Sequence, residues 1–139
     1  MISWDFVHWR SIAHVKRNML LEAAEDAVQT WLVFREIQED VGSQDLTEVA
    51  EATTGVFREL LSLGLLEAGE YYQEGGRVWG LEPRLALEQV ATECGRLAGG
   101  ATDFGGCWFR ATATGVAWVQ QYYDLLAHLS LEKSRPEGP

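Results

Sequence analysis

Cysteine, proline and positive charge are scarce in this 139-residue chain, which has two Cys, three Pro and 11 Lys and Arg against 21 Asp and Glu. Two cysteines, Cys94 and Cys107, are too few for a disulfide framework, so a reducing cytoplasm is the expected compartment. The chain also lacks an apolar run near the ~20 residues that a membrane-spanning helix needs. Residues 1–5 do not show the basic-then-apolar order of a secretory signal. We therefore expect a cytoplasmic protein without a membrane segment.

The apolar content of the chain is ordinary and sufficient for a hydrophobic core. Hydrophobic residues make up 47% of the chain and charged residues 23%, which is typical of folded globular proteins rather than disordered ones. A chain of this length fits one domain. We assign residues 1–131 to a single domain and residues 132–139, rich in polar residues with Pro and Gly, to a flexible C-terminal tail.

The shortage of positive charge is concentrated in one part of the chain. The formal net charge is -10, and residues 21–80 contain thirteen acidic residues against three basic ones. Residues 1–20 are the exception, because they carry three basic residues and one acidic residue. A surface of this composition repels phosphate backbones and attracts basic proteins, which disfavours nucleic acid as a partner. The alternative is an ordinary solvated acidic face.

The spacing of apolar residues and the positions of turn residues predict a mostly helical chain with a few strands. Asp45 and Glu48 form the pattern of a helix start, Thr53 permits a turn after a short helix, and Gly75 stands at the tip of a hairpin. The predicted elements are helices over 4–15, 18–40, 45–52, 53–63, 84–97 and 112–131, and strands over 65–72, 77–81 and 107–111.

This order of elements resembles a winged helix-turn-helix domain of the MarR and PadR kind. Residues 56–67 look like the end of a recognition helix and its entry into the wing, with the sequence VFRELLSLGLLE. Residues 108–117 are similar to the strand, Thr-x-x-Gly and helix that close such domains. The resemblance covers residues 18–82 well and 107–131 loosely. It implies an α+β fold, mostly helical and winged helix-turn-helix-like, with a small antiparallel β-hairpin or sheet.

The DNA contacts that this resemblance implies are poorly represented in the sequence. The candidate recognition helix, residues 53–63, contains one basic residue, Arg58, next to Glu59. The candidate wing contains one basic residue, Arg77, and three glutamates. Each acidic residue held against phosphate adds repulsion where affinity normally comes from counterion release. A winged-helix transcriptional regulator that acts as a dimer is therefore the alternative function and not the leading one.

Small acidic single domains of this build also resemble the immunity proteins of polymorphic toxin systems, which cover the active cleft of a basic toxin. This resemblance implies a non-enzymatic immunity or antitoxin-type inhibitor that binds a basic protein partner, such as a toxin domain, through an acidic and aromatic surface. The candidate partner-binding residues lie on or beside the hairpin or at the end of the long helix: Glu67, Glu70, Tyr71, Tyr72, Glu74 and Trp79, and Glu36, Glu39, Asp40 and Asp45.

Signals for catalysis, metals or cofactors are weak, and we expect none of the three. The histidines His8, His14 and His128 lack the spacing of metal ligands. The glycine-rich residues 99–106 are not followed by the Lys-Ser/Thr of a phosphate-binding loop. Both cysteines are interpreted as small buried hydrophobes. An enzyme whose site has no readable motif is the third hypothesis.

Overall fold

The computed structural model describes residues 6–41, 45–71, 77–102 and 105–134. Helices dominate these ranges and an antiparallel sheet of four strands completes them, which confirms the predicted α+β class. The elements are α1 (Phe6–Glu25), β1 (Val28–Gln29), α2 (Thr30–Val41), α3 (Leu46–Ser62), β2 (Leu66–Tyr71), β3 (Arg77–Leu81), α4 (Pro83–Ala98), β4 (Trp108–Ala111) and α5 (Ala113–Ser134).

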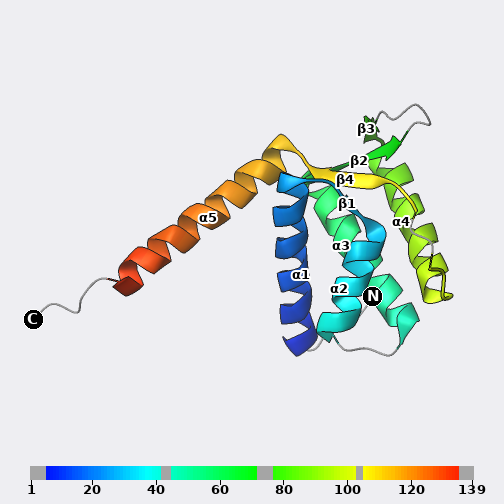
Figure 1. Ribbon diagram of the computed structural model, residues 1–139, viewed down its shortest axis with the longest axis horizontal. Coiled ribbons are helices and arrows are strands. Elements are labelled where there is room, and N and C mark those ends of the chain that lie inside the picture. The colour runs from blue at the N-terminus through cyan, green and yellow to red at the C-terminus, as the bar shows by residue number, and fades with distance from the viewer. Residues whose placement is uncertain (1–5, 42–44, 72–76, 103–104, 135–139) are drawn as a thin grey trace, which may run out of the picture.

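The sheet lies across one end of α1, α2 and α3, while α5 runs away from the rest of the molecule (Figure 1). Its strand order is β1-β4-β2-β3, so β4 lies between two strands that come much earlier in the chain. The predicted hairpin is confirmed, because β2 and β3 pair antiparallel. The predicted strand over 107–111 corresponds to β4, and the predicted helices over 84–97 and 112–131 correspond to α4 and α5. Residues 135–139 of the predicted tail lie outside the described residues.

The hydrophobic core joins the helices to the sheet. Phe57 of α3 and Phe109 of β4 are both fully buried, and their ring centroids are 4.5 Å apart. Ala68 of β2 is opposite Phe109 and is also fully buried, so this face of the sheet is turned toward the helices. Successive residues of a strand point to opposite sides of the sheet. The face of β2 and β4 that is turned away from the helices can therefore hold polar side chains.

The helices predicted over 4–15 and 18–40 have the wrong boundaries. The helix α1 continues without a break through residues 15–18, because Val15, Met19 and Ala23 form one buried stripe. The real break follows Glu25, where Val28–Gln29 adopts an extended backbone and pairs with β4. A sheet partner about eighty residues away overrides the helical periodicity that runs through this segment.

The predicted break between helices 45–52 and 53–63 is also wrong, because α3 is one continuous helix. Asp45 caps it as expected, with its carboxylate accepting the backbone N–H groups of Thr47 and Glu48. The hydroxyl of Thr53 donates to the carbonyl oxygen of Val49 at 2.8 Å, and Thr54 makes the equivalent bond one residue later. Threonines bonded in this way are compatible with a helix interior and do not start a new helix. The predicted turn at Thr53 is therefore absent, and Leu46–Ser62 forms one helix.

The start of α5 is locked onto the end of α3. The hydroxyl of Thr112 donates to the carbonyl oxygen of Gly64 at 2.6 Å and accepts the N–H of Gly115 at 3.1 Å. The backbone N–H of Thr112 donates to the carbonyl oxygen of Leu65 at 3.0 Å. Gly64 itself has φ +69°, a backbone conformation that favours glycine. The Thr-x-x-Gly segment thus joins the chain reversal after α3 to the first turn of α5.

Candidate protein-binding site

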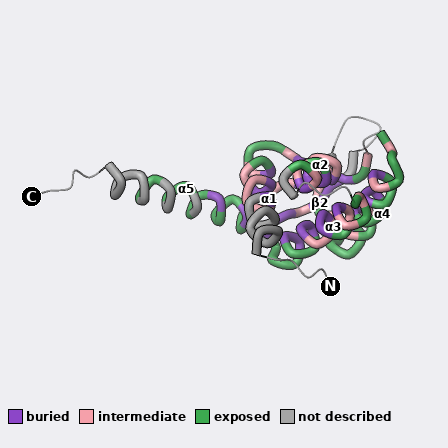
Figure 2. Tube along the Cα trace, turned by 90° about the horizontal axis from the view of Figure 1, so that it is seen from below, coloured by how far each residue is buried: buried purple, intermediate pink, exposed green. Residues whose placement is uncertain are grey.

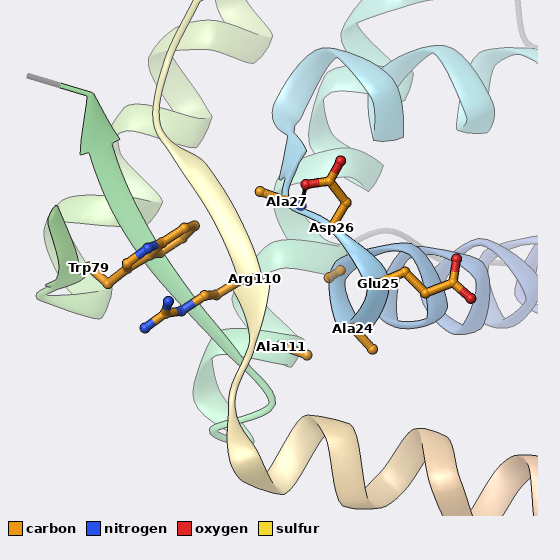
Figure 3. Close-up of a pocket in the computed structure, with 8 residues that line it drawn as sticks. Ala24, Glu25, Asp26, Ala27, Trp79, Arg110 and Ala111 are labelled. Carbon is orange, nitrogen blue, oxygen red and sulfur yellow. Dashed lines mark hydrogen bonds between the residues drawn. The ribbon is translucent and has the colours of Figure 1, made fainter. Parts of the chain in front are cut away.

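A cleft of about 370 Å³ lies between the C-terminal end of α1 and the sheet (Figure 3). We call it the Trp79 cleft. One wall consists of residues 23–27, and the other of Trp79, Arg110 and Ala111. The volume lies in the range of small-ligand and side-chain pockets. Because α1 ends where β1 joins the sheet, the end of the helix is held beside β4 and forms one wall of the cleft.

The sheet wall of the cleft is built around Arg110. Its guanidinium forms an ion pair with the carboxylate of Glu67, which is directly opposite on β2. The same guanidinium lies over the ring of Trp79, with 4.2 Å between the guanidinium carbon and the ring centroid. Gly69 lies opposite Trp79 in the ladder and has no side chain, so the indole ring and the guanidinium can approach across β2. Glu67, Arg110 and Trp79 therefore form one polar and aromatic cluster.

The helical wall of the cleft is acidic. Glu25 and Asp26 are exposed and stand at the C-terminal end of α1, which has no basic residue in its last turn. The carboxylate of Asp26 accepts the N–H of Ala27 at 2.8 Å, and neither residue has an ion pair within the described part of the chain. The C-terminal end of a helix carries a partial negative charge, and each carboxylate there costs about 0.3–1 kcal/mol. This wall would be stabilised by an added cation.

The hairpin residues predicted for partner binding are partly accounted for by this cluster. Glu67 and Trp79 meet at Arg110, as described above. Glu70 and Tyr71 belong to β2, where their backbones pair with Val78 and Arg77. Tyr72 and Glu74 lie outside the described residues.

The second predicted set lies away from the Trp79 cleft. The end of α2 and the start of α3 are at the end of the helices opposite the sheet (Figure 1). Glu36 accepts a hydrogen bond from Asn18 at 3.1 Å, Glu39 forms an ion pair with Arg35 at 3.3 Å, and Asp45 caps α3. Asp40 belongs to α2. These residues and the hairpin residues therefore belong to two separate surfaces, and three members of this set already have intramolecular partners.

The three charged residues of the cleft were not predicted as binding residues: Glu25, Asp26 and Arg110. The predicted helix over 18–40 places the two acids in its interior, and only the break after Glu25 makes them a helix end. Arg110 was not a candidate because its neighbours across the sheet depend on the register of β4 with β2. The sequence carried two signals for this site: Trp79, which was a predicted partner-binding residue, and the lack of Lys and Arg in residues 18–34.

The two cysteines are described by the structure, and they form no metal site with other described residues. Cys94 and Cys107 are buried, as predicted, and neither is in a disulfide bond. Burial raises the pKa of the Cys94 thiol to about 11, so the thiol is protonated at neutral pH and is a poor nucleophile. Among the described residues no group of three or more His, Cys, Asp and Glu side chains is arranged to hold a metal ion.

No helix in the described part of the chain is long and apolar enough to cross a membrane. Comparisons of the chain with protein families, with curated proteins and with solved structures find no match.

Proposed function

We propose that this chain is a non-enzymatic protein-binding domain, of the immunity or antitoxin type, that binds a basic partner such as a toxin domain at the Trp79 cleft. One observation carries the proposal: Glu25 and Asp26, two exposed carboxylates that form no ion pair within the described residues, line the same cleft as the indole ring of Trp79. Functional sites are places where natural proteins break local rules such as the preferred charge at a helix end. A cationic group from a partner would reverse the unfavourable interaction between these acids and the helix dipole.

The charge balance within the cleft favours a cationic side chain. Arg110 is already matched by Glu67, so among the described residues Glu25 and Asp26 leave the cleft with two negative charges that no ion pair compensates. A Lys or Arg side chain of the partner would meet these carboxylates at one end and would pack its apolar stem beside Trp79. A buried aromatic residue next to matched charges is typical of the residues that dominate binding energy in protein interfaces.

The decisive experiment uses co-expression of the chain with the product of the neighbouring gene, followed by titration calorimetry at several salt concentrations. The double variant Glu25→Lys/Asp26→Lys is expected to weaken binding at least about tenfold, which corresponds to about 1.4 kcal/mol. The matched control is Glu51→Lys/Glu88→Lys, which changes the net charge by the same amount at exposed sites outside the cleft. The control is expected to change affinity only a few-fold, through weaker long-range attraction.

An equal loss of affinity in the two double variants would show that the Trp79 cleft is not part of the interface and that the net charge alone affects binding. A partner that binds equally well at low and high salt would contradict the electrostatic basis of the proposal.

We further propose that the fold is a modified winged helix. Support comes from the helix pair α2 and α3, from the glycine turn that leads α3 into β2, and from the Thr-x-x-Gly segment that returns the chain to that turn. The order of strands in the sheet gives further support. The strand β4 lies between β1 and β2 and pairs antiparallel with both, and β3 extends this unit at the edge next to β2.

The alternative function, a winged-helix DNA-binding regulator, is favoured by one observation. The exposed positions Thr47, Arg58 and Ser62 share one stripe of α3, where a recognition helix would face the major groove. Glu51 shares the stripe and reduces its attraction for phosphate. Tight, salt-sensitive binding to a palindromic duplex that is lost in Arg58→Ala, together with no binding to a basic protein, would establish this alternative.

A further inference from the structure

The helix α5 extends well beyond the body of the protein. It has 22 residues, which at 1.5 Å per residue gives a length of about 33 Å. Its first turns pack against α1 and β4, and the remainder runs away from the other elements (Figure 2). Gly115 and Val119 are buried at this junction. Val116, Trp118 and Tyr123 are 47%, 37% and 45% exposed, so the helix presents large apolar side chains to solvent even near the body.

The sequence of α5 is unusually poor in charge for an exposed helix. Residues 113–131 contain one acidic residue, Asp124, and no Lys or Arg. They include four leucines as well as the exposed residues named above. A helix that is apolar on most of its circumference is normally buried, and an exposed apolar patch of this kind normally marks an interaction surface.

One stripe of α5 is symmetric about the midpoint of the helix. Positions 118, 122, 125 and 129 follow four- and three-residue steps, so they share one stripe, and they carry Trp, Tyr, Leu and Leu. The midpoint of Ala113–Ser134 falls between residues 123 and 124. Positions 122 and 125 are equally far from this midpoint, and so are positions 118 and 129. If two copies of α5 pair antiparallel about this midpoint, position 118 of one helix lies opposite position 129 of the other, and position 122 lies opposite position 125. Each of the four resulting pairs joins an aromatic residue of one copy to a leucine of the other.

We infer that α5 pairs antiparallel with α5 of a second copy of this chain, about a twofold axis that passes near residues 123 and 124. Such an interface uses the same stripe on both copies, as twofold symmetry requires. The contact covers the stripe around Trp118, which is 37% exposed, and removes that apolar surface from water, whereas Val116 and Tyr123 lie on another side of α5 and stay outside it.

The charge distribution favours a second copy over the basic partner as the occupant of this stripe. Each copy has a net charge of -10, so two copies repel each other except where charge is low. The stripe contains no carboxylate, whereas the acidic residues that would attract a basic protein lie on the body. Asp124 is about 120° from the stripe at 100° per residue, so the axis does not bring the two aspartates into the seam. The inference does not rest on the proposed function.

The test measures the molar mass of the full chain in solution by light scattering after size-exclusion chromatography. The expected mass is about twice the 15.5 kDa of the chain at a protein concentration of about 100 µM. The double variant Leu125→Glu/Leu129→Glu is expected to be monomeric. The matched control Gln120→Glu/Ala127→Glu adds the same charge at exposed positions on the opposite side of α5 and is expected to remain a dimer. Circular dichroism and thermal unfolding of each variant report whether the body is folded.

A monomeric parent chain, or a dimer that survives Leu125→Glu/Leu129→Glu, would overturn the inference. The antiparallel direction has its own test, which uses a spin label attached to Glu132→Cys. Two labels are expected to be offset by about 25 Å along the helix pair, because each is 8.5 residues from the axis and the rise is 1.5 Å per residue. Parallel helices would give no offset. Both native cysteines are buried, so the label is directed to the introduced thiol.

Discussion

The substitution Gly115→Ala is expected to destabilise the protein strongly, although Ala is normally the better helix former. Gly115 is in the first turn of α5 and is buried against the end of α3. A Cβ atom at this position would overlap the carbonyl oxygen of Leu65 and would lie 3.1 Å from the carbonyl carbon and 3.2 Å from Cβ of Ala111. Carbon atoms in ordinary contact are about 3.5–4.0 Å apart, so either α5 or the turn after α3 has to shift.

The magnitude follows from what such a shift would break. The carbonyl oxygen of Leu65 accepts the N–H of Thr112 at 3.0 Å, and the hydroxyl of Thr112 donates to Gly64 at 2.6 Å. Weakening two hydrogen bonds costs about 1 kcal/mol each, and overpacking adds about 1–3 kcal/mol. The helical preference of Ala over Gly returns about 0.5–1 kcal/mol. The expected net loss is about 3 kcal/mol, which is a large share of the ~5–15 kcal/mol of a typical domain.

The assay is urea unfolding followed by tryptophan fluorescence, with Gly55→Ala as the control. Gly55 lies within α3, and a Cβ atom there would meet nothing within 4 Å. The control is therefore expected to be more stable than the parent by about 0.5–1 kcal/mol. At equal protein concentration, replacement of glycine by alanine should therefore lower the free energy of unfolding at position 115 and raise it at position 55. A Gly115→Ala protein as stable as the Gly55→Ala protein would refute the docking of α5 onto the Leu65 turn.

Three further expectations concern single residues. Thr112→Val removes the hydroxyl that bonds Gly64 and Gly115 and should cost about 1–2 kcal/mol in urea unfolding, whereas Thr112→Ser should retain most of the stability. Glu93→Gln should lower the free energy of unfolding by about 1–3 kcal/mol, because the Glu93 carboxylate is 3% exposed and pairs with Arg96 at 2.7 Å; an unchanged melting temperature would contradict this. The pKa of Cys94 is raised by burial, from 9.0 to about 11, so the folded state favours the neutral thiol, and this contribution to stability is present below pH 9 and is lost as the pH rises toward 11. Stability in Cys94→Ala should fall less over the same pH range, and an identical pH dependence in the two proteins would refute the assignment.

Features that depend on neighbouring residues in the chain could be predicted from the sequence. The cap at Asp45, the hairpin strands β2 and β3, the helix α4 and the apolar character of α5 all follow from residue type and short-range spacing. The acidic character of residues 21–80 is likewise a property of composition. Each of these is decided within about ten residues, where helix periodicity, capping and turn preferences operate.

The errors have a common physical origin in contacts between distant segments. Helical periodicity continues through residues 26–29, yet the backbone of β1 pairs with β4 and ends α1 at Glu25. Conversely, Thr53 and Thr54 resemble a helix start but bond to carbonyl groups inside α3. In both cases the local preference is worth less than the packing and backbone pairing that the assembled fold supplies.

The sequence alone thus determined the fold class, the uneven acidity and the elements made by local interactions. Only the tertiary structure decided which of the described charged residues lie together. It matched Glu67 with Arg110 across two strands, placed Trp79 over the same guanidinium, and turned Glu25 and Asp26 into the acidic end of a helix beside them. Sheet register and helix ends are set by pairing between segments far apart in the chain, and this is why the Trp79 cleft has no motif in the sequence.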